Sequence, residues 1–567
     1  MNYDNICIYS VKGWLLMVNF SLFYPMDYEM SPLKMSNDAI NDLSLDYIVT
    51  TLTEDVFEQN SIKQLMTHIE CNAELIKYRC DVFEDFLRLP QLRYSLTELL
   101  DMLGELKELE KFKKDSDSSS LWQIINKLRE IDRYIDCITS LKDTLGKLDL
   151  KSEGLCTLRK LVNDIYDDGS FEPLKKDIED AFKQARQLKS VTIGVNLDDM
   201  LRPVRAGILA LHSREFTDSG ILKRFMAIST KKEGGVLPGN DYAHLKTFHA
   251  SSSKEFKLAY DDTPTGQDRL SDSMKQVVTE IMDRVVRNLK DVLQKHININ
   301  GYAFISLMPE IIFYIRWAEL IDKIKAKGLP LCKAEVLPVE KREIYAEGIY
   351  NLKLAIKAVN GEELDIITNE ITFDDETGRI FILTGPNRGG KTTITQALGL
   401  AVLMAQCGIY VPCSKFALSP CDNIYTHFPA DENETVDLGR LGEESKRLSE
   451  IFEKATNKSL LLLNESLATT NVTEGVYIAT DVIKAMRYLG VRCIFNTHMH
   501  ELGANASKMN SDVEGISKIE SMVTGVENGE RSFKVYINPP QGLSYAKDIA
   551  EKYGVTFDKI KKTIDNR

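Results

Sequence analysis

The sequence lacks the cysteine patterns of a zinc site or of a disulfide-bonded extracellular domain. Its ten cysteines are scattered, with no C-x-x-C pair among them, whereas metal sites and disulfide frameworks place cysteines in close or regularly spaced pairs. The thiols are therefore interpreted as reduced, mostly packed side chains, and we expect a cytoplasmic protein.

The chain also lacks a long uninterrupted apolar run. Residues 6–24 are the candidate for a signal or a membrane anchor, but Lys12 interrupts them and no small-residue cleavage site follows. A membrane-spanning helix needs about 20 consecutive apolar residues, so we expect no membrane role. Residues 1–35 show no clear hydrophobic period and are assigned no function.

Excess positive charge is missing as well. The formal net charge is −13, from 71 Lys and Arg against 84 Asp and Glu. This balance argues against a chain that coats nucleic acid indiscriminately, so any DNA contact must be regional. At 567 residues the chain is too long for a single core, and ordinary domain sizes predict roughly two to four domains.

The first part of the chain has the pattern of a helical domain. Residues 36–190 contain few prolines and much Leu, Glu and Lys. One apolar seam steps by four and three residues through Leu92, Leu96, Leu99, Leu103 and Leu106. This spacing places the leucines on one face of a helix. We predict an all-α core and lever over 36–190, and returning lever helices over 266–335, where residues 274–292 repeat such a face.

A β-containing segment interrupts these helices. Residues 191–195 and 207–211 are typical of short strands, and residues 231–240 of a loop. We predict a clamp-like insertion over 191–265. Its basic residues include Lys223, Arg224, Lys231, Lys232, Lys246 and Lys254. These side chains either meet DNA phosphates or form an ordinary solvated face.

The most informative stretch is a glycine-rich loop between a strand and a helix. An apolar run at 380–384 leads into residues 385–392, which fit G-x-x-x-x-G-K-[ST], and a helical pattern follows. Backbone N–H groups of such a loop surround phosphate oxygens, Lys391 reaches the outer phosphates and Thr392 places its hydroxyl on Mg²⁺. The predicted nucleotide-binding residues are Gly385, Pro386, Asn387, Arg388, Gly389, Gly390, Lys391, Thr392 and Thr393. The alternative, a turn that binds nothing, fits the order of strand, loop and helix less well.

Two further apolar runs end in polar residues suited to catalysis. Residues 459–463 precede Asn464 and Glu465, and residues 491–495 precede a segment that ends at His498. Parallel strands bring their carboxyl ends to one edge of a sheet, where active sites form. Glu465 is then placed to accept a proton from the attacking water, Asn464 to lie near the metal's hydration shell and His498 to reach the γ-phosphate. Taken singly, each would be interpreted as a solvated or packed polar residue.

Several motifs resemble those of the MutS family. The family's T-G-P-N-x-G-G-K-[ST] motif resembles Thr384-Gly-Pro-Asn-Arg-Gly-Gly-Lys-Thr392. Its L-x-A-Q-x-G-x-x-V-P motif resembles Leu403-Met-Ala-Gln-Cys-Gly-Ile-Tyr-Val-Pro412. Its T-H-x-x-E-L motif resembles Asn496-Thr-His-Met-His-Glu-Leu502. Residues 542–545 resemble its closing segment. The match is specific over residues 340–560 and architectural over 36–335.

The resemblance implies an α/β P-loop ATPase domain of the ABC type over 336–567, with C-terminal dimerisation-type helices. It implies ATP and Mg²⁺ as cofactors and a homodimer with composite ATP sites, in which lever and clamp domains close on DNA. Each site would use the partner's signature segment, which aligns with residues 439–444, where only Glu444 matches the family's S-T-F-M-x-E. The adenine-stacking aromatic of the family falls near Ile366.

Two departures from the family shape the functional prediction. The family's Asp-Glu pair reads Asn464-Glu465, which keeps the base but loses a charge that organises Mg²⁺, so we expect slow ATP hydrolysis. The lever begins too early to leave room for mismatch-reading and connector domains, so we expect a DNA clamp in repair or recombination that does not read mismatches. The alternatives are a nucleotide-gated binder of a protein, ribosomal or RNA partner and, less compatible with long levers, a transporter ATPase.

Overall fold

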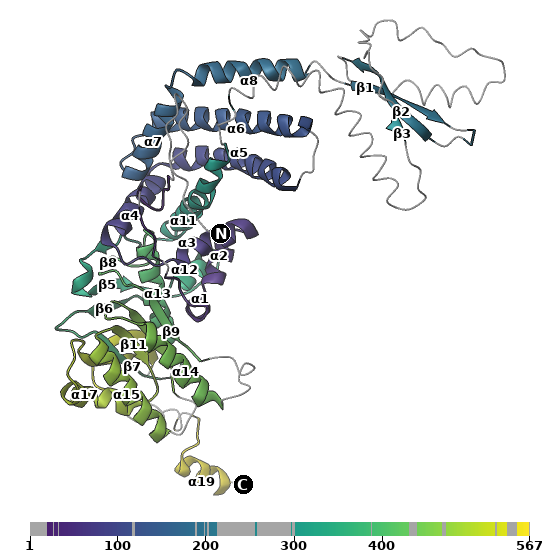
Figure 1. Ribbon diagram of the computed structural model, residues 1–567. Coiled ribbons are helices and arrows are strands. Elements are labelled where there is room, and N and C mark those ends of the chain that lie inside the picture. The colour runs from purple at the N-terminus through teal and green to yellow at the C-terminus, as the bar shows by residue number, and fades with distance from the viewer. Residues whose placement is uncertain are drawn as a thin grey trace. The chain divides into compact units, whose positions relative to one another are not determined.

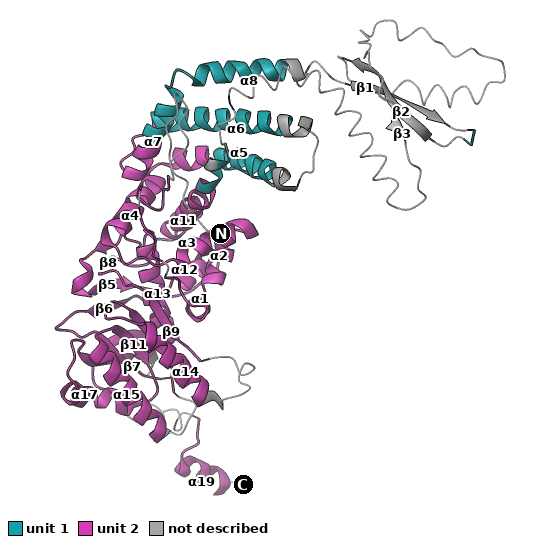
Figure 2. Ribbon diagram, viewed as in Figure 1, with its two compact units in different colours: residues 1–18, 97–146, 159–306 teal, residues 19–96, 147–158, 307–567 magenta. Residues whose placement is uncertain are grey.

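The computed structural model divides into two compact units (Figure 2). Unit 1 comprises residues 1–18, 97–146 and 159–306, and unit 2 comprises residues 19–96, 147–158 and 307–567. The residues that the structure describes are 20–26, 28–31, 33–115, 120–186, 190–197, 199–200, 203–212, 256–257, 296, 301–386, 388–429, 439–467, 472–527, 530–540, 551 and 553–565. The predicted helical face at 274–292, the basic residues of the insertion from Lys223 to Lys254, and residues 542–545 lie outside these ranges.

Long amphipathic helices make up most of the described part of unit 1. They are α5 (Pro90–Asp115), α6 (Ser120–Lys147), α7 (Glu153–Tyr166) and α8 (Phe171–Arg186). The boundary between the units falls within three of them, since residues 90–96 of α5, Lys147 of α6 and residues 153–158 of α7 belong to unit 2. The leucine seam from Leu92 to Leu106 lies in α5 and is at most 1% exposed, which confirms the helix predicted from its spacing. An ion pair of 2.8 Å between Arg133 and Glu105 joins α6 to α5.

A small antiparallel sheet also belongs to unit 1. Its strands, in the order β1-β2-β3, are β1 (Ser190–Leu197), β2 (Pro203–His212) and β3 (Phe256–Lys257). Val191 pairs with Leu211 and Gly194 with Gly207. The two strands predicted in this part of the sequence are therefore confirmed.

Unit 2 is built on a six-stranded sheet with the strand order β13-β12-β7-β11-β10-β9. The strands are β7 (Ile380–Thr384), β9 (Ile424–His427), β10 (Leu460–Asn464), β11 (Arg492–Asn496), β12 (Ile519–Glu527) and β13 (Glu530–Ile537). All neighbours are parallel except β12 and β13. β7, β10 and β11 are buried throughout, which explains why their sequences are continuous apolar runs.

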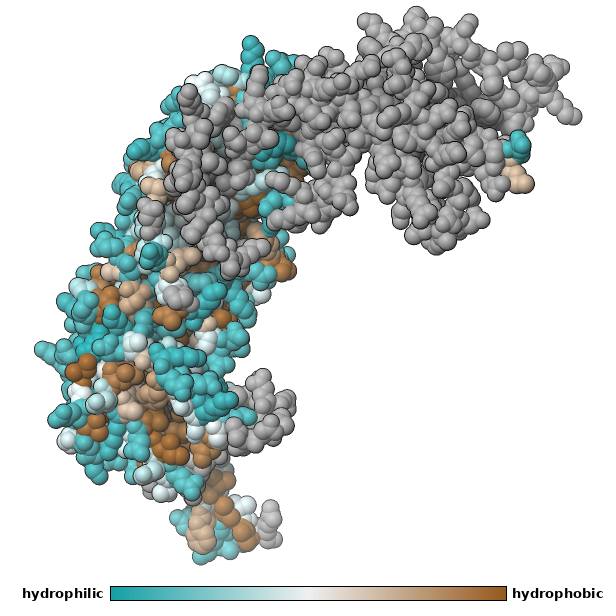
Figure 3. Space-filling model, in the orientation of Figure 1, coloured by the Kyte–Doolittle hydropathy of each residue, from teal (hydrophilic) through white to brown (hydrophobic). Residues whose placement is uncertain are grey.

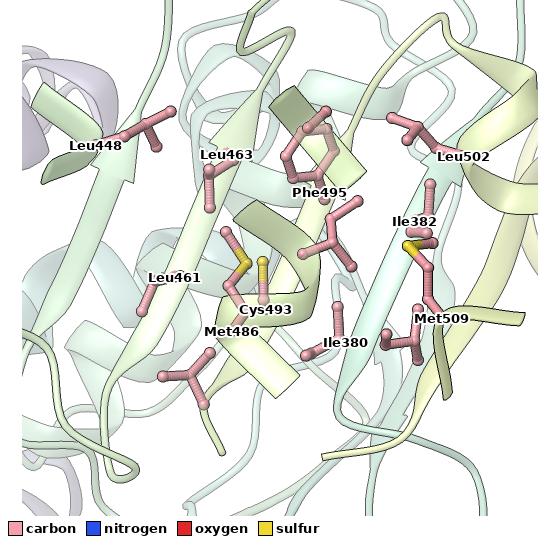
Figure 4. Close-up of a cluster of buried hydrophobic side chains, with 14 of the residues drawn as sticks. Ile380, Ile382, Leu448, Leu461, Leu463, Met486, Cys493, Phe495, Leu502 and Met509 are labelled. Atoms are coloured by element: carbon pink, nitrogen blue, oxygen red, sulfur yellow. The ribbon is translucent and has the colours of Figure 1, made fainter. Parts of the chain in front are cut away.

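Helices cover both faces of this sheet (Figure 1). α13 (Lys391–Gln406) packs on β10 and β11. The helices α14 (Gly439–Lys454), α15 (Val472–Leu489), α16 (His500–Ala504) and α17 (Ala506–Asp512) contribute to the buried cluster drawn in Figure 4. In that cluster Ile380 and Ile382 of β7 lie with Met486 of α15 and Met509 of α17. The sheet is thus the middle layer of a helix–sheet–helix arrangement.

A second, four-stranded sheet and further helices complete unit 2. The sheet order is β4-β8-β5-β6, with β4 (Glu335–Val336), β5 (Ile344–Ile349), β6 (Asn369–Phe373) and β8 (Lys415–Leu418). The other helices and helical turns of unit 2 are α1 (Asn37–Asp42), α2 (Leu45–Leu52), α3 (Val56–Thr67), α4 (Ala73–Arg88), α11 (Met308–Ala326), η2 (Val339–Lys341), α12 (Leu352–Val359) and α19 (Phe557–Asp565). The helical turn η1 (Gly301–Leu307) belongs to unit 1 except for Leu307.

Glycines allow close packing around α13. A Cβ at Gly399 would lie 2.6 Å from Leu462 Cδ1 and 2.7 Å from Leu43 Cδ2, so this glycine lets the helix approach both leucines. Just beyond the end of α13, a Cβ at Gly408 would overlap Arg79 of α4. Gly408 also has a φ of +79°, a value that favours glycine.

An N-terminal strap, residues 20–26, is bound to α11 and α4. The Glu310 carboxylate accepts hydrogen bonds of 2.6 Å from Ser21 Oγ and from Leu22 N. Arg79 Nε donates to Phe23 O at 3.0 Å, and its guanidinium lies over the Phe23 ring. Burial raises the pKa of Glu310 to about 7.

The surface of unit 2 exposes apolar side chains at its C-terminal helix. Phe557, Ile560 and Ile564 of α19 are 77%, 42% and 61% exposed, and hydrophobic residues gather there in Figure 3. Among the helices of the described residues, none is long and apolar enough to cross a membrane.

Candidate functional site

The glycine-rich loop joins the end of β7 to the start of α13. Gly385 has a φ of +146°, and Gly390, the N-cap of α13, has a φ of +88°. A Cβ at Gly385 would overlap Thr524 Oγ1, and one at Gly389 would lie 2.9 Å from Pro386 O. The chain therefore requires glycine at these positions for its backbone shape, and α13 directs its free N-terminal N–H groups at the loop. Asn387 lies outside the described residues.

Lys391 folds back over this loop. Its side chain is buried at 5% exposure, and Nζ donates to Gly385 O at 3.0 Å and to Pro386 O at 3.3 Å. Burial lowers the pKa of Lys391, and the Glu465 carboxylate opposes this change. A cation held at the mouth of a loop of backbone N–H groups suits a bound polyphosphate.

A network of three polar side chains joins the first turn of α13 to β10 and β11. Thr392 Oγ1 donates to Asn464 Oδ1 at 3.0 Å. Asn496 Nδ2 donates to the same oxygen. Both asparagines are buried, at 7% and 0% exposure. Because Thr392 uses its proton in this bond, its oxygen lone pairs stay available to a cation.

Asn496 is a site residue to which the sequence analysis assigned no role. It pairs with Asn464 in the register of β10 and β11. The signal was present, since each asparagine is the first polar residue after an apolar strand. The position of Asn496 becomes informative only once β10 and β11 are known to be neighbours, because this brings the two asparagines together.

Glu465 and His498 form a close pair at the same edge of the sheet. His498 Nε2 lies 2.6 Å from Glu465 Oε1. This hydrogen bond and the charge of His498 lower the pKa of Glu465. The Glu465 backbone has a φ of 54°, and its N–H donates to Asn496 O at 2.8 Å.

The turn after Glu465 is held by β9 and α14. His427 Nδ1 lies 2.7 Å from Ser466 Oγ, and the Ser466 hydroxyl donates to His427 O at 3.2 Å. Burial lowers the pKa of His427 to about 4, so this ring is neutral near pH 7. Leu467, with a φ of 63°, donates its N–H to Glu444 Oε2 at 2.7 Å. Residues 468–471, which follow, lie outside the described residues.

An aromatic side chain lies beside the loop at a position that sequence reasoning did not find. Phe533 of β13 is 42% exposed, and a Cβ on Gly390 would lie 3.3 Å from its Cδ1. Asn369 fixes this part of β13, because its side chain donates to Phe533 O and accepts from Val535 N. The family alignment pointed instead to Ile366.

The predicted site residues that the structure describes come from three adjacent strands. Lys391 and Thr392 follow β7, Asn464 and Glu465 end or follow β10, and His498 follows β11. The register β7-β11-β10 brings these strand ends to one edge. The geometry is compatible with the predicted roles, which stay predictions.

A phosphate-bound Mg²⁺ fits this donor set better than a metal held by protein side chains alone. Within the described residues, His, Cys, Asp and Glu form no cluster of three or more that could hold a metal ion. Mg²⁺ is commonly bound by one or two protein oxygens together with phosphates and waters. Thr392 Oγ1 is the protein oxygen available for such a role.

Comparison with known proteins gives matches to two families of domain. Residues 381–555 match the model of MutS domain V, and residues 71–327 match that of the MutS2 N-terminal domain.

Curated relatives match over about a third of the chain. The DNA mismatch repair protein MutS of Clostridium botulinum is 30% identical over 201 residues, which are 35% of this chain and 21% of that protein. The Endonuclease MutS2 of Thermus thermophilus is 32% identical over 198 residues, 35% of this chain and 26% of that protein. The matched segment thus spans about a quarter or less of these relatives. With domain matches in both halves of the sequence, the chain is a relative of the MutS family.

Proposed function

We propose that this protein binds ATP with Mg²⁺ at residues 385–393 and hydrolyses it slowly. The observation that carries the proposal is the meeting of Lys391, the Thr392–Asn464 hydrogen bond and the Glu465–His498 pair at one edge of a parallel sheet. The match to MutS domain V over the same strands supports it. We further propose that the strand order of this domain is that of an ABC-type P-loop ATPase.

Each side chain of the site has a proposed role that follows from its position. Lys391 and the N–H groups at the start of α13 bind and orient the outer phosphates. Glu465 accepts the proton of the attacking water, and His498 holds the Glu465 carboxylate at 2.6 Å. Thr392, with Asn464 behind it, offers the oxygen that would bind Mg²⁺. When bound, Mg²⁺ neutralises charge on the phosphate oxygens.

Slow turnover follows from two features of this edge. Asn464 is neutral, so the site lacks the carboxylate that usually organises the metal. Glu465 has a lowered pKa, and a carboxylate with a lower pKa is a weaker general base. Both effects reduce the rate of the chemical step without removing the base.

We propose that the protein acts on DNA as a homodimeric clamp with composite ATP sites. Two observations support this: the MutS-type matches and the exposed apolar residues of α19, which suit a dimer contact. The insertion predicted at 191–265 is compatible with it. The relatives' printed names concern DNA mismatch repair and an endonuclease. We propose a role in DNA repair or recombination. A protein or ribosomal RNA partner is the outcome expected if DNA does not bind.

Changing Lys391 to alanine tests the nucleotide site. The change should weaken ATP binding at least about a hundredfold, equivalent to roughly 3 kcal/mol, because it removes the cation at the phosphate loop. Fluorescence titration with a labelled ATP analogue measures the loss. The matched control is Lys415→Ala, which removes an exposed lysine paired with Glu347 on the other sheet. Equal affinity of Lys391→Ala and wild type would show that the site is misassigned.

A further inference from the structure

The turn that carries Glu465 has an unusual backbone. Glu465 and Leu467 have φ values of 54° and 63°, and neither is glycine. Side-chain-bearing residues occupy this left-handed region only when surrounding contacts hold them there. Leu467 is in addition fully buried. The orientation of the Glu465 carboxylate therefore depends on whatever fixes this turn.

Hydrogen bonds at each of its three residues fix the turn. Asn496 O accepts from Glu465 N at 2.8 Å, His427 Nδ1 lies 2.7 Å from Ser466 Oγ, and Glu444 Oε2 accepts from Leu467 N at 2.7 Å. The first two partners belong to strands of the sheet. Glu444 belongs to a helix, and its bond is the charge-assisted one, because a carboxylate accepts from a backbone N–H.

The helix that carries Glu444 is itself anchored on several sides. One turn further along α14, Arg447 Nη1 donates to Phe428 O at 3.2 Å, and Arg447 Nη2 lies 3.0 Å from Asp38 of α1. Leu448 packs in the buried cluster with Leu461 and Leu463 of β10 (Figure 4). The Glu444 carboxylate is thus presented to the turn from a rigid support.

We propose that Glu444 is a positioning residue for Glu465: its carboxylate holds Leu467 in the left-handed conformation and so keeps the catalytic carboxylate against His498. The proposal rests on the function proposed above. Glu444 acts within its own subunit, through the backbone of residues 465–467.

The test combines a full and a conservative substitution with a control on the same helix. Glu444→Ala removes the acceptor, Glu444→Gln keeps an uncharged acceptor oxygen, and Glu450→Ala removes an exposed glutamate of α14. Amide hydrogen exchange of the peptide covering residues 463–467 reports on the turn without requiring catalysis. Titration with a labelled ATP analogue and single-turnover hydrolysis then separate binding from chemistry.

We expect faster exchange in Glu444→Ala, unchanged ATP affinity and a hydrolysis step slowed roughly 10- to 100-fold, the size of effect that misplacing a catalytic group produces. Glu444→Gln should be intermediate and Glu450→Ala should match wild type. Combined with Glu465→Gln, Glu444→Ala should slow the residual reaction no further, because Glu444 acts through Glu465.

Other results would overturn the positioning role. Unchanged exchange in Glu444→Ala would show that this contact does not hold the turn, and unchanged hydrolysis would show that the turn does not position the base. An equal loss of rate in the wild-type and Glu465→Gln backgrounds would indicate a merely structural role. If wild-type protein fails to bind ATP, the proposed function falls and the catalytic role of Glu444 with it, while the exchange data still decide whether Glu444 holds the turn.

Discussion

Among single residues, Asn464 has the clearest chemical consequence. Its Oδ1 accepts hydrogen bonds from Thr392 and from Asn496. A carboxylate of the same shape could accept both bonds, so the neutral amide changes the charge of the site more than its structure. A substitution of Asn464 by aspartate should therefore change the rate of hydrolysis with little change in structure.

Asn464→Asp should speed ATP hydrolysis roughly tenfold, which corresponds to about 1.4 kcal/mol of transition-state stabilisation. The added charge would strengthen the organisation of Mg²⁺, and the hydrogen bonds to Oδ1 would remain. Phosphate release at saturating Mg²⁺ measures the change. Asn457→Asp, at an exposed position, controls for the added charge alone. An equal or lower rate in Asn464→Asp would remove this explanation of slow turnover.

Strand ends in this chain could be identified from the sequence, but their partners could not. The apolar runs before Asn464 and His498 predicted buried strands, and β10 and β11 confirm them. The contacts of Asn496, Glu444 and Phe533 depend on strand order and on helix placement. Sequence periodicity shows which face of an element is buried, but it does not show which distant element covers that face.

At the scale of elements, the contact between the N-terminal strap and α11 contains a titratable carboxyl group, Glu310. Glu310 accepts from Ser21 and Leu22 while buried. Burial raises its pKa from the ordinary value of 4.5 to about 7, and this effect is larger than the lowering by the hydrogen bonds from Ser21 and Leu22. A carboxyl group with a raised folded-state pKa stabilises the fold fully below its unfolded pKa. That contribution is lost as the pH rises through about 7.

Glu310→Gln should therefore flatten the pH dependence of stability between about pH 4.5 and pH 7. In this window wild type loses the stabilisation that the protonated Glu310 supplies, whereas glutamine does not titrate. Urea unfolding at several pH values measures the free energy of unfolding of both proteins. Glu319→Gln, at a partly exposed position on the same helix, is the control. Parallel pH curves for wild type and Glu310→Gln would contradict the expected titration.

At the scale of the whole molecule, the negative net charge limits where DNA could bind. A net charge of −13 leaves contact to a local basic surface, and the insertion at 191–265 is the predicted place for it. Such binding should depend steeply on salt, because phosphate contacts release counterions.

DNA affinity should fall about a hundredfold between 50 and 200 mM salt if about four phosphates are contacted. Fluorescence anisotropy with duplex, branched and single-stranded DNA, with and without ATP, measures this. Replacing Lys231 and Lys232 with alanine should reduce the salt slope, while Lys415→Ala should leave it unchanged. Absence of binding to all three DNA forms would favour the protein or ribosomal RNA partner.

The close packing at Gly408 has a mechanical consequence. α13 begins at Lys391 beside the phosphate loop and ends at Gln406, two residues before Gly408, which lies against Arg79 of α4. Its 16 residues make a helix about 24 Å long. A tilt of about 5° about its phosphate-loop end would therefore move its other end by about 2 Å. Because a Cβ at Gly408 would overlap Arg79, there is no gap at this point that would let α13 move toward α4 without displacing it. We therefore expect a tilt of α13 at its phosphate-loop end to shift α4 through the contact at Gly408.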